Sequence, residues 1–372
     1  MINETTKDRV RARIQSLLCL AVLCGILIAG LWPFERPPNG VTWLGNQNGL
    51  RFSGDATVRS SGSFQTAGPS DENSCSLDLW LQPGATNDSN TILSFSTAAN
   101  PRQLSIHQYR SSLIVNREIR SDPHRNATIG IDGVFRQIKP VFITIASGAQ
   151  ETAMYVDGVL ARKFQRFRLE SNCTGQLVIG TSPIADDSWP GQLRGIAIYR
   201  QELTAAQALS HYESWTTQGR PRLSGDERAI ALYLFVERGG SVVHNAVPGG
   251  IDLHIPKRYS LVHQRFLEPF WEEYKLDREH WKDILINIAG FIPLGFFFCA
   301  YWSRVRPTGG AALVTTAFGL AVSLTIEVLQ AYLPTRNSGT TDLFTNTLGT
   351  FLGAKLYDLK AARDLLARIY LE

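Results

Sequence analysis

The chain has 372 residues, which is long enough for two or three domains. Its formal net charge of +4 is too small and too dispersed along the sequence to indicate a nucleic-acid partner. Hydrophobic residues make up an ordinary 44%, but they are concentrated toward the two ends of the chain. We therefore expect an integral membrane protein with a soluble domain in its middle.

The first apolar stretch follows a short basic segment at the N-terminus. Residues 16–34 (SLLCLAVLCGILIAGLWPF) are long enough for a helix that crosses a bilayer core of about 30 Å. A cleaved signal peptide is the alternative, since the start is basic and the apolar region is short. No small-x-small cleavage site follows, however, and Trp32-Pro33-Phe34 is an unusual cleavage context. We favour an uncleaved transmembrane helix at 16–36 after a cytoplasmic N-terminus at 1–15.

The middle of the chain has the pattern of an all-β domain. Residues 40–255 contain short alternating apolar runs separated by turns rich in Gly, Asn, Asp and Pro. Asp157-Gly158 predicts a tight hairpin. Thr204, with Gln207 three residues later, predicts the capped start of a helix. Many short strands with few helices between them predict a two-sheet sandwich or jelly roll.

Several of these segments carry a resemblance to a known fold. NGLRFSG (48–54), CSLDLWLQP (75–83), MYVDGVL (154–160) and GQLRGIAIYRQELT (191–204) resemble, in order and spacing, laminin-G-like (LamG) domains of the concanavalin A-like lectin/glucanase superfamily. The resemblance covers roughly 45–215 and implies an all-β jelly-roll sandwich. Such domains often bind carbohydrate or other proteins, sometimes through calcium. The carboxylate pair that glucanases carry on one strand does not occur here.

Individual residues of this domain each have a functional and a structural interpretation. Asp186 and Asp187 are candidate calcium ligands, but a solvated loop is the favoured interpretation, and we expect no other cofactor. Trp43 and Trp189 are candidate sugar-stacking rings, although core packing is the commoner fate of tryptophan. The histidines do not cluster, so no metal site is expected.

The five cysteines divide between the apolar ends and the middle. Cys75 and Cys173 are the two in the β domain, and an oxidising compartment allows a disulfide between them. The sequence does not show whether their Cα atoms are close enough, so this pairing stays open. Cys19, Cys24 and Cys299 lie in apolar stretches, where cysteine behaves as a small apolar residue.

Three further apolar stretches lie in the last third of the chain. They run over about 284–302, 309–333 and 342–357, and the last is marginal because it is rich in Thr and Gly. An aromatic and charged interfacial segment at 261–282 precedes them. The fold class we expect is multidomain: the jelly-roll sandwich at 40–255 plus an α-helical transmembrane bundle of four spans. The second to fourth spans occupy 283–358, and an amphipathic cytoplasmic tail, or alternatively a partner-binding helix, occupies 359–372.

Basic residues predict how the spans are oriented. Lys and Arg are concentrated before the first span, between the second and third, and after the fourth, as cytoplasmic segments require. We therefore expect a multi-pass protein of the inner (cytoplasmic) membrane with both termini in the cytoplasm. Residues 37–282 would then be periplasmic or extracellular.

Polar residues recur at helical spacing inside these spans, where ionisable groups are costly and usually functional. Within each of these spans, the polar residues share one helical face. We expect these faces to meet in an outward-facing polar pocket. The candidate binding residues are Asp283, Asn287, Glu327, Gln330, Arg336, Asp342 and Asn346. The alternative is that the two aspartates only cap their helices and the asparagines only bridge helices. Glu327 lies in mid-helix, which capping of its own helix does not explain.

These polar residues also carry a second resemblance. DILINIAGFIPLGF (283–296), SLTIEVLQAYLPTR (323–336) and TTDLFTNTLGTFLGAKLY (340–357) resemble the VanZ family of membrane proteins, as does LWPF (31–34). The family's polar positions correspond to Asn287, Glu327, Gln330, Arg336, Asp342 and Asn346. The sandwich would then be a large insertion in the first outside loop. The family is named after a protein linked to teicoplanin resistance, and no reaction follows from the residues.

Two functions compete on these grounds. The first is an envelope protein that is not an enzyme: the sandwich binds a cell-surface glycan or protein, and the membrane unit binds a lipid-linked or amphiphilic ligand. This function would connect it to glycopeptide-antibiotic resistance or other surface processes. The second is an intramembrane enzyme that acts on an envelope lipid with Glu327 as general acid or base. A transporter is less favoured, because the spans are few and show no internal repeat.

Overall fold

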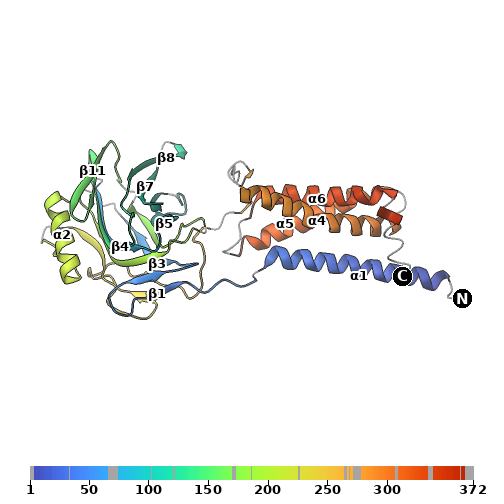
Figure 1. The fold of residues 1–372 in the computed structure, drawn as a ribbon, viewed down its shortest axis with the longest axis horizontal. Coiled ribbons are helices and arrows are strands. Elements are labelled where there is room, and N and C mark those ends of the chain that lie inside the picture. The colour runs from blue at the N-terminus through green and yellow to red at the C-terminus, as the bar shows by residue number, and fades with distance from the viewer. Residues whose placement is uncertain are drawn as a thin grey trace. The chain divides into compact units, whose positions relative to one another are not determined.

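The chain forms two compact units in a computed structural model (Figure 1). One unit combines residues 1–35 with 264–372, and the other comprises residues 36–263. The structure describes residues 4–32, 34–65, 74–101, 103–119, 122–169, 173–185, 187–224, 227–263, 266–267, 269–270, 278–305, 309–333, 338–360 and 362–364. We call residues 36–263 the sandwich and the other unit the helical unit.

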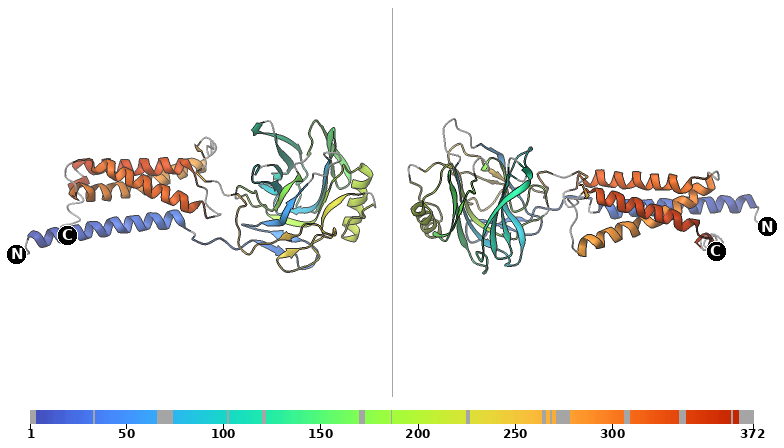
Figure 2. Two further views of the ribbon diagram at one scale, coloured as in Figure 1. Left: turned by 180° about the vertical axis from the view of Figure 1, so that it is seen from behind. Right: turned by 90° about the horizontal axis from the view of Figure 1, so that it is seen from above.

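Two antiparallel sheets form the sandwich (Figure 2). The first sheet has the order β1 (Val41–Trp43), β2 (Leu50–Phe52), β13 (Gly191–Tyr199), β4 (Cys75–Pro83), β9 (Val141–Ser147), β10 (Glu151–Val156) and β11 (Val159–Gln165), with β14 (Ala229–Tyr233) also paired to β13. The second has the order β15 (Val242–Val243), β16 (Leu253–His254), β3 (Val58–Phe64), β12 (Gly175–Ile179), β5 (Ser89–Ser96), β6 (Leu104–Tyr109), β7 (Ser112–Ile119) and β8 (Asp122–Ile131). The predicted architecture of a two-sheet all-β sandwich is confirmed.

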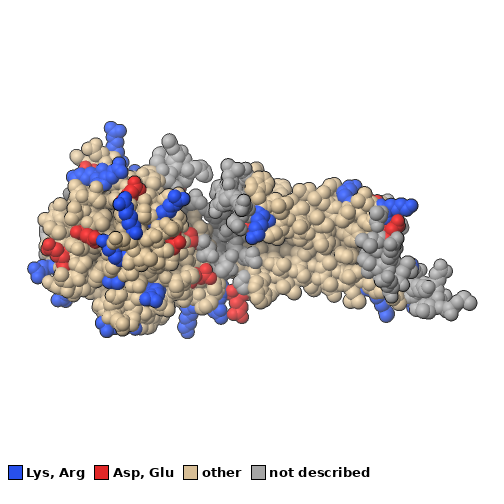
Figure 3. Space-filling view, viewed as in Figure 1, with Lys and Arg blue, Asp and Glu red and all other residues tan. Residues whose placement is uncertain are grey.

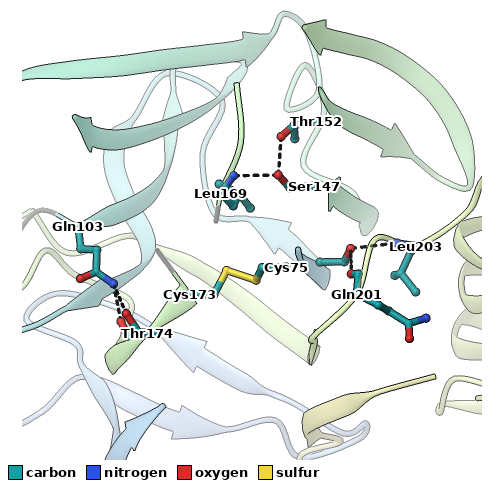
Figure 4. The surroundings of a disulfide bond; sticks show 10 residues. Cys75, Gln103, Ser147, Thr152, Leu169, Cys173, Thr174, Gln201 and Leu203 are labelled. Atoms are coloured by element: carbon teal, nitrogen blue, oxygen red, sulfur yellow. Dashed lines mark hydrogen bonds between the residues drawn. A yellow bond between two sulfur atoms is a disulfide. The ribbon is translucent and has the colours of Figure 1, made fainter. Parts of the chain in front are cut away.

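Along the strands, every second side chain faces the space between the two sheets, and the apolar side chains at these positions form the core. Leu77, Leu79 and Leu81 of β4 are fully buried in one cluster with Leu93 and Phe95 of β5. Full burial of side chains of this size contributes roughly 1.5–3 kcal/mol each. A disulfide between Cys75 and Cys173 joins chain segments 98 residues apart inside this core, with a Cα–Cα distance of 6.5 Å (Figure 4). The pairing that the sequence left open is therefore made.

The turn and the helix start that local sequence patterns predict are both present in the structure. Asp157 and Gly158 take positive φ of 50° and 76° in the hairpin between β10 and β11, as a two-residue hairpin turn requires. Thr204 and Gln207 form the predicted capping box at the start of α2 (Ala205–Gln218). Trp215 of α2 packs directly over Gly195 of β13, where an added Cβ would lie 2.3 Å from the indole ring. The helix therefore covers the outer face of the first sheet.

The helical unit contains four long helices within its described residues: α1 (Glu4–Leu31), α4 (Arg278–Val305), α5 (Ala311–Gln330) and α6 (Thr340–Asp358). In the part of the chain that the structure describes, three segments are long and apolar enough to cross a membrane: Arg9–Leu31, Trp281–Val305 and Ala311–Gln330. In Figure 3 the visible flank of this unit is largely free of charged side chains. We expected four such spans. By this criterion of length and mean hydropathy the expectation is wrong, because α6 does not meet it.

The composition of α6 explains the difference. It buries Asn346, Gly349, Thr350, Gly353 and Ala354 instead of large apolar side chains. These small residues bring its backbone against α4: a Cβ added at Gly349 would lie 2.3 Å from the Ile288 carbonyl oxygen, and one added at Gly353 would lie 2.1 Å from that of Ile292. Small residues permit close helix packing but lower the mean hydropathy. The helix forms because its neighbours cover its polar face.

Two predicted segments lie partly outside the described residues. In the interfacial segment at 261–282, residues 264–265, 268 and 271–277 are not described, and in the tail at 359–372, residues 361 and 365–372 are not described.

Candidate functional site

Glu327 lies near the end of α5 and is 1% exposed. Its Oε2 accepts a hydrogen bond of 2.8 Å from the backbone N–H of Gly339. Gly339 is the N-cap residue of α6, and no side chain of its own caps that helix. The carboxylate therefore lies at the positive end of the α6 dipole, where a negative charge is stabilised. Glu327 caps a helix other than its own.

A second contact joins α4 to the same end of α6. Nδ2 of Asn287 donates to Oδ1 of Asp342 at 2.7 Å. Asp342 lies in the first turn of α6, where the helix dipole stabilises a carboxylate. Both side chains are half-buried.

A third contact joins α5 to α6 one turn deeper. Nδ2 of Asn346 donates to Oγ of Ser323 at 3.0 Å, and both residues are buried. Ser323 and Asn346 are each four residues from a member of the pairs above, so the contacts follow one another along the helix axes. Buried and half-buried polar side chains in an apolar helical unit thus link α4, α5 and α6.

Gln330 extends these contacts to α1. Its Nε2 donates to the carbonyl oxygen of Gly30 at 2.8 Å. Two buried acceptors, Oε1 of Gln330 and Oδ1 of Asn346, have no hydrogen-bond partner among the described residues. A buried unsatisfied polar atom costs roughly 1–3 kcal/mol, so both oxygens are acceptors that a hydrogen-bond donor would stabilise. We call Asn287, Ser323, Glu327, Gln330, Asp342 and Asn346 the polar cluster.

Two predicted site residues do not join the polar cluster in the described structure. Asp283 is exposed, and because α4 begins at Arg278 it lies inside the helix instead of capping it. Arg336 lies outside the described residues. Within the described ranges, no three or more His, Cys, Asp or Glu side chains are arranged so that they could hold a metal ion.

Candidates in the sandwich have structural roles. Trp189 is fully buried and donates its Nε1 hydrogen to Oε1 of Gln108 at 2.8 Å, as the core-packing interpretation predicts. Trp43 is half-buried and donates to the carbonyl oxygen of Gly240. Asp187 accepts from Thr91 Oγ1 at 2.5 Å and from the Ser182 N–H at 2.6 Å. Asp186 lies outside the described residues.

Sequence reasoning missed a buried ionic group beneath α2. The His211 ring lies 2.8 Å from Asp78 through Nδ1 and 3.0 Å from Glu227 through Nε2, and all three side chains are at most 1% exposed. Tyr199 and Thr144 also donate to Asp78. Burial lowers the pKa of His211, but the hydrogen bonds and charges of Asp78 and Glu227 outweigh it and raise the pKa above its ordinary value. An imidazolium bridging two carboxylates therefore fastens α2 to the first sheet.

Comparisons with known families agree with the division of the chain into a sandwich and a helical unit. Residues 232–361 match the sequence model of the VanZ/LLP1 family, and residues 52–208 match the concanavalin A-like lectin/glucanases superfamily. The chain carries a VanZ/LLP1 domain and a concanavalin A-like domain. Protein VanZ of Enterococcus faecium is 34% identical over 80 residues, which are 22% of this chain. The chain spans about half the length of that relative, 47%.

Solved structures resemble the sandwich at low identity. The native heptameric SAP-like pentraxin of Limulus polyphemus is 14% identical, covering 60% of this chain and 96% of its own, with a TM-score of 0.38. A botulinum neurotoxin type C structure is 17% identical, covering 38% of this chain and 35% of its own, with a TM-score of 0.31. The VanZ/LLP1 match begins at Leu232, within β14 of the sandwich, and continues into the helices.

Proposed function

We propose that this protein is a VanZ-like component of the cell envelope whose polar cluster binds the headgroup of a lipid-linked or amphiphilic ligand. The observation that carries the proposal is Glu327, a carboxylate 1% exposed inside an apolar helical unit and bound to the start of a neighbouring helix. Ionisable groups at such depth are costly and usually serve function. Asn287, Asp342 and Asn346 add hydrogen-bonding groups around the same helix start.

The cluster's chemistry indicates the kind of headgroup. The unpaired oxygens of Gln330 and Asn346 are acceptors, so they require a ligand that donates hydrogen bonds, as sugar hydroxyls and amides do. Arg336, which comes between α5 and α6 in the sequence, would supply a bidentate donor to a phosphate. A lipid-linked, phosphorylated sugar offers both features.

Orientation is part of the proposal. Basic residues in the N-terminal part of α1, between α4 and α5 and after α6 favour a cytoplasmic position for those segments under the positive-inside rule. The Cys75–Cys173 disulfide favours an oxidising compartment for the sandwich. We propose that α6 crosses the membrane with the other three helices, because its polar face is covered by α4 and α5. The sandwich would then bind a surface glycan or protein outside the cytoplasm.

The test of the helical unit uses the purified full-length chain. A polyprenyl phosphate and its sugar-carrying form are titrated in detergent, and binding is followed by native mass spectrometry. Glu327→Gln and Asn346→Leu should weaken binding, whereas Thr325→Val, at an exposed position of α5, should not. Equal binding by all variants at equal abundance would overturn the assignment of the site.

The sandwich is tested separately. Full-length protein and a variant lacking residues 36–263 are incubated with isolated cell walls. Retention of the full-length protein and loss of the shortened one is the expected result. If the shortened variant binds as well, the sandwich does not supply the surface binding.

A further inference from the structure

The chain enters and leaves the sandwich at one end. Pro38 and Arg258 form an isolated antiparallel bridge, and the Tyr259 N–H donates to the Pro37 carbonyl oxygen at 2.9 Å. The entering and leaving segments, residues 36–40 and 257–263, therefore lie side by side. We call the end of the sandwich that they form the tether end.

Strand registers place other loops at this end. Val41, the first residue of β1, pairs with Phe52, and Phe52 in turn pairs with Gly191. Gly191 also pairs with Pro83, so the last residue of β4 lies at the tether end. Residues 84–88 then lead directly into β5 at the same end.

The position of the start of β5 shows that two further loops lie at the tether end. Ser89 pairs with Tyr109, so the turn between β6 and β7 lies at the tether end. Loop 132–140 lies beside that turn, because the Phe135 N–H donates to the Ser111 carbonyl oxygen at 2.8 Å. Ser112 Oγ also donates to Asp132 at 2.9 Å and fixes the start of this loop.

These two loops expose a set of apolar and basic side chains. Tyr109 is 54% exposed and Ile138 is 56% exposed. The Arg110 guanidinium lies 5.9 Å from the centre of the Tyr109 ring, and Arg136 and Lys139 are exposed beside Ile138 in sequence. We call Tyr109, Arg110, Arg136, Ile138 and Lys139 the loop tip.

The composition of the loop tip matches one kind of surface. Aromatic rings prefer the headgroup region of a bilayer, and Lys and Arg are attracted to anionic lipids. Two acids lie nearby: Asp88 is half-buried, and Asp132 is exposed and accepts from Ser112. The three basic side chains of the loop tip outnumber these two carboxylates, so the net charge of this surface is positive by one. We infer that the loop tip docks on the anionic phospholipid surface of the membrane that carries the helical unit.

Covalent attachment makes even a weak docking contact sufficient. Only residues 32–35 separate the last residue of α1 from the sandwich, and five residue steps span at most about 18 Å. The membrane surface is therefore present at high effective concentration. The tip lies on β6, four strands from β16 at the tethered side, which is about 19 Å across at 4.8 Å per strand. The connecting segments and the loop tip would then hold the tether end at the membrane surface at two separated points.

The test places an environment-sensitive fluorophore on the tip of the full-length protein. The three free thiols are removed as Cys19→Ala, Cys24→Ala and Cys299→Ala, which leaves the disulfide intact. Ile138→Cys is labelled with a nitrobenzoxadiazole and compared in nanodiscs of phosphatidylcholine alone and of phosphatidylcholine with phosphatidylglycerol. Ala98→Cys, exposed in the turn after β5 at the opposite end, is the matched control.

The expected result is a blue shift and loss of about half the fluorescence to doxyl-labelled lipid at position 138 in the anionic discs alone. Arg110→Gln, Arg136→Gln and Lys139→Gln together should abolish both, as should high salt. An emission at position 138 that matches position 98 in every disc overturns the inference. So does a shift that appears only when a soluble polyanion is added, because the tip would then recognise an anionic polymer and not lipid.

Discussion

The carboxylate of Glu327 accepts a hydrogen bond from the backbone N–H of Gly339, so α5 supplies the cap that α6 lacks. This bond connects the predicted functional residue to the integrity of the fold. Any substitution of Glu327 therefore has to be examined for stability as well as for binding.

Removal of the Glu327 side chain should destabilise the helical unit. Glu327→Ala leaves the Gly339 N–H unsatisfied in a buried position, which costs roughly 1–3 kcal/mol. Glu327→Gln keeps an acceptor oxygen and should cost less. Thermal unfolding in detergent, followed by helical circular dichroism, checks the order of the three proteins. An alanine variant as stable as the parent would show that the bond contributes nothing.

The contact between α4 and α6 predicts a position-specific effect of a single methyl group. Gly349→Ala places its Cβ 2.3 Å from the Ile288 carbonyl oxygen, so the helices must separate, with an expected loss of about 1–3 kcal/mol or more. Gly290→Ala on α4 is the matched control, because nothing lies within 4 Å of its added Cβ. The control should be neutral or stabilising by about 1 kcal/mol, since alanine favours helix. Equal melting temperatures for the two variants would contradict the packing described.

The ionic group beneath α2 predicts that the sandwich loses stability as pH rises above the ordinary pKa of histidine. The pKa of His211 is raised above the ordinary 6.5, so its stabilisation is complete below that value and is lost as pH rises through the folded-state pKa. Tryptophan-detected unfolding of the sandwich should show this decline in the parent and a flatter profile in His211→Gln.

A stronger change at the same residue should cost more. His211→Ala leaves Asp78 and Glu227 buried without their shared cation, which costs roughly 3–5 kcal/mol. His254→Gln, at an exposed position, is the control and should leave stability unchanged. Full stability of His211→Ala at neutral pH would mean that the three groups are not ionised as described.

Reduction of the disulfide should lower the stability of the sandwich and leave the helical unit unaffected. The bond closes a loop across a sequence separation of 98 residues, and loss of such a constraint typically costs about 2–4 kcal/mol. Cys75→Ala with Cys173→Ala should reproduce the effect of a reductant on the parent. A reductant that shifts the melting of the double variant equally would point to another cause.

Local patterns made most of the fold predictable. The alternation of Leu77, Leu79 and Leu81 indicates a strand with one core face, and Asp157-Gly158 favours one hairpin geometry. These signals depend on residues adjacent in sequence. They identify elements, and the order of elements then indicated the jelly roll.

Contacts between distant residues were not predictable in the same way. Asp78 occupies the polar position of an alternating strand, and nothing nearby in sequence shows that His211, 133 residues later, will meet it. The Cys75–Cys173 distance depends on the packing of the whole domain. For Asp283, the helix began five residues earlier than expected, which changed a cap into an internal residue. The polar cluster was partly predictable, because helical spacing assigns faces but not partners.

The bridge between Pro38 and Arg258 has a consequence for how such a chain can be assembled during evolution. A domain whose first and last residues are neighbours can be placed between two helices without pulling them apart. The loop between α1 and α4 can therefore accept, exchange or lose such a domain while the helices keep their own contacts. Relatives that share these helices should accordingly differ most in what they carry at this one junction.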